Sequence, residues 1–222
     1  LKSCSRGIKK NKDRRAGALI HKALALVSFA LLSFPAQSEN YRLQKSVRFE
    51  NITVEQGLPK TRYLSTTQDK YGFMWFGTDI GLVRYDGYEF TVYQNDPDDP
   101  ASLPSNRATV VYMDSQNTLW VGTDAGLSRY NHDDDSFTNF RHNPKDPLDP
   151  GAPIVRIYED REGILWLGHF IAGGWFAGLS AFDQRNGSFT SFRHDPNDDQ
   201  SLPPGTVMNI QEDRSGLLWI GT

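Results

Sequence analysis

From about residue 49 onward, short hydrophobic runs alternate with polar breaks, and the same runs recur in the same order. Each run alternates apolar or aromatic residues with polar ones and is bounded by Gly, Asn, Asp or Pro, which predicts short β-strands. One run follows the pattern Asp-x-x-Gly-x-x-Trp-x-Gly-Thr. Its tryptophans are 45, 46 and 53 residues apart, at Trp75, Trp120, Trp166 and Trp219.

Two more phrases follow the tryptophan run in three of the four units. They are Gly-Leu-x-x-aromatic, beginning at Gly81, Gly126 and Gly178, and Phe-Thr-x-aromatic, beginning at Phe90, Phe137 and Phe189. With an apolar run before each Asp, a complete unit therefore holds four strands. Repeats of about 45 residues with four strands each predict an all-β fold, a β-propeller of four-stranded antiparallel blades. We place the blades near residues 60–93, 105–141, 153–193 and 206–222.

The Asp-x-x-Gly step between the first two strands predicts a tight turn, with Asp capping local amides and Gly, or Asn117 in the second unit, at positive φ. The four repeated tryptophans are interpreted as structural, one large ring per blade filling the gap between sheets.

The opening of the repeat region is incomplete. Phe49 to Thr53 takes the place of a fourth strand without the three that should precede it. We expect this strand to pair with a last blade not present in the chain, closing the propeller. Six to eight blades need roughly 270 to 360 residues. The chain is thus expected to be a fragment of about three and a half blades.

Residues 1–38 have the order of a secretory signal peptide. A basic stretch that includes Arg14 and Arg15 precedes an apolar run, Ala23 to Phe34, and then Ala36-x-Ser38 resembles a small-residue cleavage site. We expect cleavage, with residues 39–222 as the mature part, although an uncleaved N-terminal anchor is the alternative.

Cysteine and charge limit what the mature part can do. Cys4, the only cysteine, lies in the leader, so no thiol remains for a disulfide, a metal or nucleophilic attack. The mature part keeps 16 basic and 26 acidic residues. An acidic exported domain repels phosphate backbones, so we expect no nucleic-acid partner.

These residues resemble the two-component regulator propeller repeats, found in the periplasmic sensor regions of bacterial histidine kinases, hybrid two-component proteins and some diguanylate cyclases. The opening Phe-x-x-Leu-Thr-x-Glu-x-Gly-Leu-Pro pattern is matched by Phe49 to Pro59, and the tryptophan phrase by Asp69 to Gly87. The resemblance covers Phe49 to Thr222. It implies a periplasmic region of an inner-membrane protein, with one or two propellers, a small β-sandwich, one transmembrane helix downstream and a cytoplasmic kinase or cyclase domain. It also implies a homodimer.

Acidic loops link the units and offer carboxylates for calcium. Their Asp-Pro and Asn-Pro steps also suit rigid turns, which we favour, and we predict no metal site and no cofactor. His142 and His194 repeat with the blade and are expected to support these loops. The Asp-box of sialidases has a similar phrase, but its Asp-to-Gly spacing is one residue shorter, which argues against a glycosidase.

The third unit has an insertion that the repeat does not explain, Gly168 to Gly178. In propeller topology this loop opens on the same face as the acidic loops, and function usually sits on such loops. His169, Phe170, Trp175 and Phe176 are the predicted ligand-binding residues, for an unidentified small molecule or oligosaccharide. Packing of the aromatic rings over the blade end is the alternative.

The sequence therefore predicts a periplasmic ligand-sensing module of a transmembrane signalling protein, with a sensor histidine kinase favoured over a diguanylate cyclase as the output. No catalytic residue is predicted in this segment. Two other classes stay open, an exported propeller lyase or hydrolase and an exported protein-binding scaffold.

Overall fold

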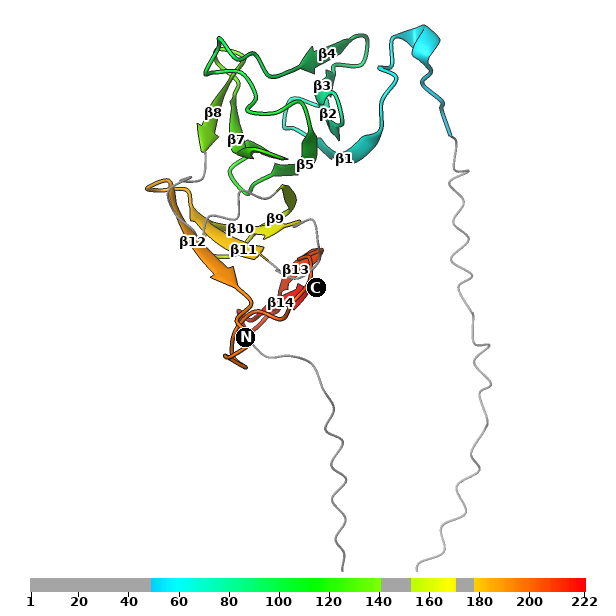
Figure 1. The fold of residues 1–222 in the computed structure, drawn as a ribbon. Coiled ribbons are helices and arrows are strands. Elements are labelled where there is room, and N and C mark those ends of the chain that lie inside the picture. The colour runs from blue at the N-terminus through cyan, green and yellow to red at the C-terminus, as the bar shows by residue number, and fades with distance from the viewer. Residues whose placement is uncertain (1–48, 141–152, 171–177) are drawn as a thin grey trace, which may run out of the picture. The chain divides into compact units, whose positions relative to one another are not determined.

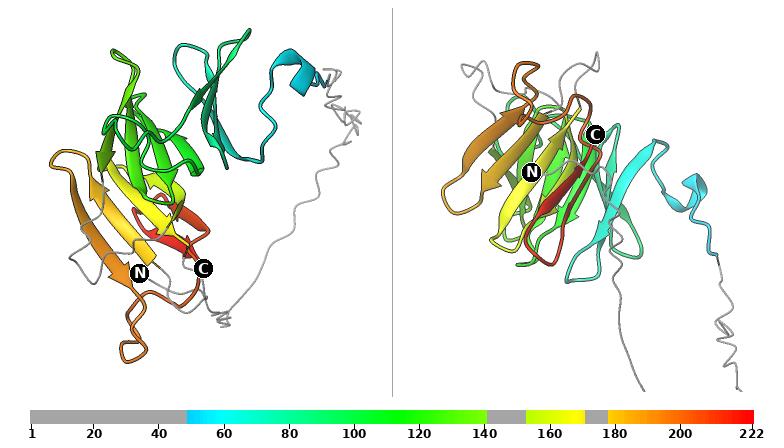
Figure 2. Two further views of the ribbon diagram at one scale, coloured as in Figure 1. Left: turned by 45° about the horizontal axis from the view of Figure 1, so that its top comes forward. Right: turned by 90° about the horizontal axis from the view of Figure 1, so that it is seen from below.

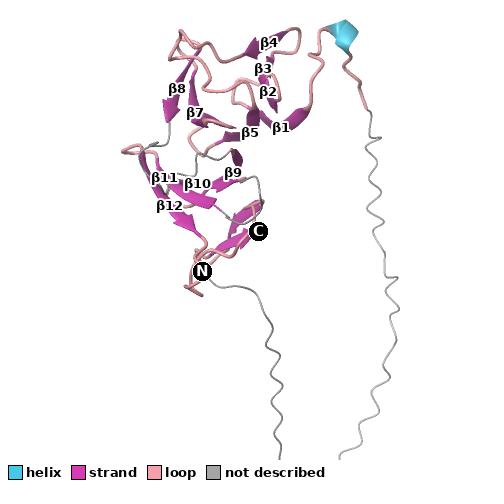
Figure 3. Cartoon of the chain, in the orientation of Figure 1, coloured by secondary structure: helices cyan, strands magenta, loops and turns pink. Residues whose placement is uncertain are grey.

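Short strands form nearly all the regular structure of the chain. The computed structural model describes residues 49–140, 153–170 and 178–222. Within these ranges, the strands are joined by turns and accompanied by one turn of 3-10 helix, Val54–Gln56 (Figures 1 and 3). No helix in the described ranges is long and apolar enough to cross a membrane. The leader and most of the third-unit insertion lie outside the described residues.

The strands form three four-stranded antiparallel sheets and one hairpin, each sheet in sequence order (Figure 1). The first blade contains β1 (Tyr63–Gln68), β2 (Met74–Thr78), β3 (Gly81–Tyr85) and β4 (Phe90–Tyr93). The second contains β5 (Ala108–Met113), β6 (Leu119–Thr123), β7 (Gly126–Asn131) and β8 (Ser136–Phe140). The third contains β9 (Ile154–Glu159), β10 (Ile164–His169), β11 (Gly178–Asp183) and β12 (Ser188–Arg193). The hairpin pairs β13 (Asn209–Glu212) with β14 (Leu218–Gly221). The predicted fold class, all-β with four-stranded antiparallel blades, is confirmed.

The turn between the first two strands is built in the same way in all four units. One oxygen of the aspartate accepts hydrogen bonds from the backbone amides two and four residues later, as Asp114 does from Gln116 and Thr118 at 2.9 and 2.7 Å. The other oxygen accepts the indole N–H of the tryptophan six residues later, 2.9 Å from Trp120 to Asp114. The equivalent indole bonds are Trp75 to Asp69, Trp166 to Asp160 and Trp219 to Asp213. The tryptophan is thus tied to the turn that precedes it.

The turn also needs one residue in the left-handed region. Gly72 has φ of 92° and Asn117 has φ of 62°, and both follow their aspartate by three residues. Asn tolerates this conformation better than most residues with a side chain. The predicted exchange of Asn for Gly at this turn is therefore seen in the structure.

A second glycine, at Gly77, Gly122 and Gly168 of the first three units, is required by close packing. A Cβ added to Gly122 in β6 would lie 2.6 Å from Val110 Cγ1 and 2.8 Å from Ile154 Cγ2. A Cβ on Gly168 would lie 2.6 Å from the Val207 backbone oxygen. The glycine after the tryptophan therefore lets the first strand of the next blade approach closely.

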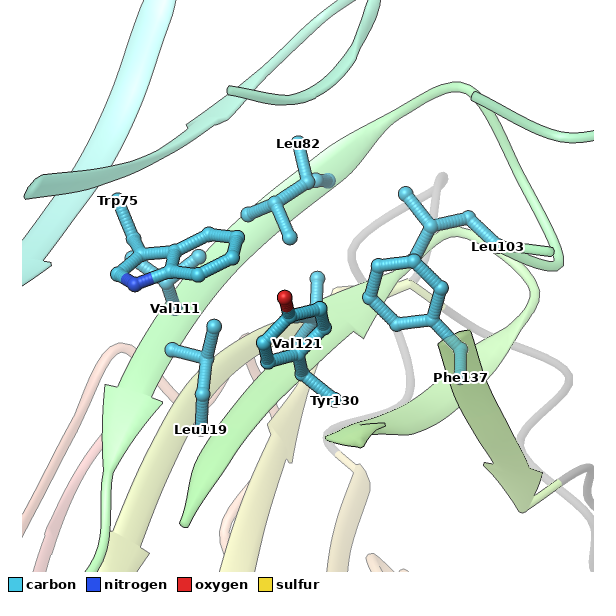
Figure 4. Packing of buried hydrophobic residues seen from close by; sticks show 9 residues of the cluster. Trp75, Leu82, Leu103, Val111, Leu119, Val121, Tyr130 and Phe137 are labelled. Carbon is cyan, nitrogen blue, oxygen red and sulfur yellow. The ribbon is translucent and has the colours of Figure 1, made fainter. Parts of the chain in front are cut away.

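Each of the first two tryptophans packs against the next blade. Trp75 is fully buried, and its ring centroid lies 4.7 Å from that of Tyr130 (Figure 4). Trp120 is 2% exposed, and its centroid lies 5.6 Å from that of Phe182. The hydrophobic clusters accordingly bridge neighbouring blades, and Figure 2 shows β13 and β14 (red) beside the yellow strands of the third blade.

The other two tryptophans are less covered. Trp166 is partly buried and packs beside Phe192, and Trp219 is 47% exposed. Residues 49–53 form no strand, and Phe49 is 89% exposed. The pairing of this segment with a last blade stays a prediction.

Candidate functional site

The predicted ligand-binding residues fall at the end of β10 and in the loop after it. His169 is the last residue of β10, and Phe170 follows it with 45% of its surface exposed. Trp175 and Phe176 lie outside the described residues, so their role stays a prediction. The structure therefore places one exposed aromatic residue of the predicted set, Phe170, at this end of the third blade.

His169 belongs to the interior of its blade. It is 1% exposed, and its Nε2 lies 3.0 Å from Ser180 Oγ on the neighbouring strand β11. The first two blades have Thr78 and Thr123 at this position, and each threonine hydroxyl donates to the carbonyl of the glycine that starts the next strand, at 2.7 and 3.0 Å. The histidine thus takes the place of a threonine that closes the turn, and its ring faces the sheet rather than solvent.

A chain of ion pairs crosses the same end of the first two blades, from residues that the sequence analysis did not single out. Arg62 precedes β1 and donates to both carboxylate oxygens of Asp79, in the β2–β3 turn, at 2.9 and 3.2 Å. Arg107 precedes β5, and its Nε donates to Asp79 Oδ1 at 3.2 Å. Arg107 Nη1 also reaches Asp124 Oδ2 at 3.5 Å, in the equivalent turn of the second blade.

The two arginines set the ionisation of this rim. Hydrogen bonding and charge from Arg62 lower the pKa of Asp79 below its usual range, with a smaller contribution from Arg107. Asp79 also raises the pKa of Arg62. Asp79 and Arg62 therefore both stay ionised at neutral pH.

This chain of ion pairs ends at the third blade. Pro153 holds the position of Arg62 and Arg107, directly before the first strand, and Phe170 holds that of Asp79 and Asp124. The Phe170 amide donates to the Pro153 carbonyl at 2.9 Å, as the Asp124 amide does to that of Arg107 at 3.3 Å. The backbone geometry is kept, but both charged side chains are lost.

The loss leaves Asp124 half paired. Its Oδ1 atom is buried and has no hydrogen-bond donor among the described residues. Buried carboxylate oxygens nearly always have a donor. This end of the second and third blades thus combines an exposed aromatic ring, Phe170, with the carboxylate of Asp124, whose buried Oδ1 has no described donor. The substitutions can be read in the aligned repeats, so sequence alone contained this signal.

The acidic inter-blade loops use their carboxylates for turns. Asp96 accepts from the Asp98 amide at 3.0 Å, and Asp99 accepts from the Ala101 amide at 2.9 Å. Asp195 and Asp198 make the same bonds to Asn197 and Gln200 in the later loop. His194 Nδ1 lies 3.0 Å from the Leu202 carbonyl, which fits its expected support of the loop. His142 and its loop lie outside the described residues.

Comparison with known proteins identifies the repeat. The sequence pattern of the two-component regulator propeller matches the chain four times, at residues 57–79, 102–125, 149–170 and 201–222. The chain belongs to the two-component regulator propeller family. Each match begins in the loop before a unit and runs through its first two strands. The turn aspartate and the tryptophan lie within this stretch.

Solved structures of two-component and one-component system proteins have the same fold as this chain. It is 30% identical, with a TM-score of 0.65, to the extracellular domain of a hybrid two-component system protein from B. thetaiotaomicron, over 78% of this chain and 23% of that one. A second extracellular domain, from a one-component system protein of B. thetaiotaomicron, is 21% identical with a TM-score of 0.60, over 78% of this chain and 22% of that one, and shows the same fold.

A curated relative, histidine kinase P4 of Formosa agariphila, is 35% identical over 81 residues, which are 36% of this chain and 6% of the relative. The chain thus spans less than a quarter of the length of each of these three proteins. It is a module of the kind found in two-component regulators.

Proposed function

We propose that this propeller is the exported ligand-sensing module of a transmembrane signalling protein whose output is a histidine kinase. The repeats belong to the two-component regulator family, and a similar solved structure is the extracellular domain of a hybrid two-component system protein. A curated relative is a histidine kinase. The signal-like order of residues 1–38 supports export, and with it a periplasmic location in an inner-membrane protein.

The observation that carries the ligand site is the end of the ion-pair chain at the third blade. Phe170 offers an exposed apolar ring, and the Asp124 carboxylate is partly exposed at the same end of the blades, with 33% of its side chain accessible. An oligosaccharide or another small polar molecule suits such a site, because a sugar has an apolar face for the ring and hydroxyl donors for the carboxylate. We propose no catalysis by this segment, since its departures from the repeat are mainly aromatic and glycine residues.

Export and sensing are tested separately. A reporter enzyme that is active only outside the cytoplasm, fused after Thr222, should be active with residues 1–38 present and inactive without them. Equal activity without the leader contradicts export by this segment.

For sensing, the full-length protein is reconstituted in vesicles and its autophosphorylation is measured against a panel of soluble oligosaccharides. At least one member should change the rate, and Phe170→Ala should weaken that change. Production of a cyclic dinucleotide in place of phosphohistidine would favour a diguanylate cyclase as the output. Turnover of an oligosaccharide by the propeller would favour the exported enzyme, and capture of an envelope protein without any signalling change would favour the scaffold.

A further inference from the structure

A polar pocket of about 300 Å³ lies between the first and second blades, at the end of the strands opposite the rim of Phe170. It is formed around the Asp-x-x-Gly turns, which join β1 to β2 and β5 to β6. Its lining includes Lys70, Tyr71, Met113, Arg129 and His132. The proposed sensing function assigns nothing to this face.

At the next two blade pairs, a glutamate occupies the equivalent place. Glu159 ends β9, and its carboxylate accepts from the Ser115 amide at 2.6 Å and from the Ser115 hydroxyl at 2.9 Å. Glu212 ends β13 and accepts from the Arg161 amide at 3.1 Å. In both pairs the glutamate precedes the turn aspartate of one blade, and the donor follows the turn aspartate of the blade before it. A carboxylate therefore bridges each of these blade pairs.

The first blade pair lacks this bridge. Met113 holds the position of Glu159 and Glu212, and Lys70 holds that of Ser115 and Arg161. Met113 packs against the buried cluster around Trp75, and a thioether is only a weak acceptor. No described residue accepts a hydrogen bond from the Lys70 amide. The pocket opens where the repeat otherwise places a carboxylate.

The surroundings of the pocket favour a negative ligand. Lys70, Arg129 and His132 are exposed, and the Lys70 ammonium lies 5.0 Å from the centre of the Tyr71 ring. Tyr71 and His132 are stacked at 4.2 Å, which gives the pocket a flat aromatic wall.

The one acidic residue of the lining, Asp69, is already engaged. Its carboxylate accepts from the Trp75 indole N–H at 2.8 Å and from the amides of Tyr71 and Phe73 at 2.9 Å each. Among the charged side chains of the lining, those free to meet a ligand are thus the cations Lys70 and Arg129.

We propose that this pocket binds a small carboxylate-bearing ligand, whose carboxylate takes the place that Glu159 and Glu212 take in the other blade pairs. The carboxylate accepts from the Lys70 amide and faces the Lys70 ammonium, while the body of the ligand lies along Tyr71 and His132 toward Arg129. Charge-assisted hydrogen bonds of this kind are roughly twice as strong as neutral ones. Binding there ties the first blade to the second.

Titration calorimetry of the full-length protein at low salt tests this proposal, with glutarate as the probe and the uncharged glutaramide as its control. Saturable binding of glutarate and none of glutaramide is expected. Met113→Glu supplies the missing carboxylate from the chain itself and should weaken glutarate binding about tenfold or more, whereas Met113→Leu should leave it unchanged.

A variant away from Met113 keeps the test independent of that position. Lys70→Met removes the ammonium and should weaken glutarate binding several-fold, with the melting temperature retained. Wild-type protein that shows no saturable glutarate binding overturns the proposal, as does Met113→Glu protein that is folded and binds glutarate as wild type does.

Discussion

At the scale of single residues, the turn aspartate joins backbone and core in every unit. In the second blade Asp114 is only 5% exposed, and its carboxylate serves two backbone amides and the Trp120 indole. Each of these three partners is a hydrogen-bond donor. A carboxylate, which only accepts, suits this position, so we expect an amide side chain of nearly the same shape to be a poor substitute.

Asp114→Asn should lower the free energy of unfolding by about 1–3 kcal/mol, because its amide nitrogen would face the Trp120 N–H, donor against donor. Urea unfolding of the single variants and of Asp114→Asn combined with Trp120→Phe measures this coupling. The aspartate replacement should cost less once the indole is absent. Equal costs in both backgrounds would show that the indole bond contributes nothing.

Acid should weaken the protein through carboxylates whose pKa is lowered by folding. Hydrogen bonding to Arg62 lowers the pKa of Asp79, and hydrogen bonds from Ser215 and Trp219 lower that of Asp213. A lowered folded-state pKa gives stability that is present above the unfolded value, about 4, and is lost as pH falls through the folded value. The melting temperature should therefore drop below about pH 4, and Asp79→Asn should show a smaller drop than wild type. An Asp79→Asn profile parallel to wild type would contradict this origin.

At the scale of the element, the strands and the turns require glycine for two different reasons. Gly122 in β6 is crowded by Val110 and Ile154, and Gly72 sits at positive φ with no atom within 4 Å of an added Cβ. Gly122 is required because neighbouring side chains leave no room for a Cβ, whereas Gly72 is required by the backbone conformation of its own turn.

Gly122→Ala should lower the free energy of unfolding by about 1–3 kcal/mol, the usual cost of overpacking, because a methyl group would clash with two side chains. Gly72→Asn is the matched control and should cost less than about 1 kcal/mol, since the second blade already has Asn117 at this turn. Thermal or urea unfolding of the two variants decides the point. A larger loss in Gly72→Asn would mean that turn conformation, not blade packing, selects the glycines.

Most of the strands and turns can be predicted from the sequence. Alternation and turn residues indicate the strands, and the repeat of Asp, Gly and Trp indicates how they combine. Contacts between blades are harder to predict, because they join residues about 45 positions apart and depend on how the blades stack. The Ser115–Glu159 bridge and the crowding at Gly122 therefore emerge only from the structure.

The candidate site was predicted less completely. The third unit was selected because its insertion breaks the repeat, and Phe170 is exposed there. His169 is a predicted ligand-binding residue, but in the structure it fills the buried position of a threonine, where the Ser180 hydroxyl on β11 pairs with its ring. Asp124 was missed because its significance depends on an arginine that Pro153 replaces in the next blade.

At the scale of the whole molecule, the units are alike in their cores and differ at their ends. Aspartate and tryptophan make the same turn in every unit. In such a repeat array, stability is set mainly by nearest-neighbour interfaces. If the proposed sensing function holds, ligand selectivity should depend on the few positions where one blade departs from the others. The third blade, with Pro153 and Phe170, is the departure on the rim that we assign to sensing.

The most direct test of this account converts the third blade to the pattern of the first two. Pro153→Arg combined with Phe170→Asp should continue the ion-pair chain and supply Asp124 with a donor. The measurement is ligand-dependent autophosphorylation of the full-length protein, with an oligosaccharide that activates wild type, alongside the melting temperature. We predict a folded protein that melts near wild type and no longer responds to the ligand. A folded double variant that responds as wild type does would contradict the assignment of this rim as the sensing site.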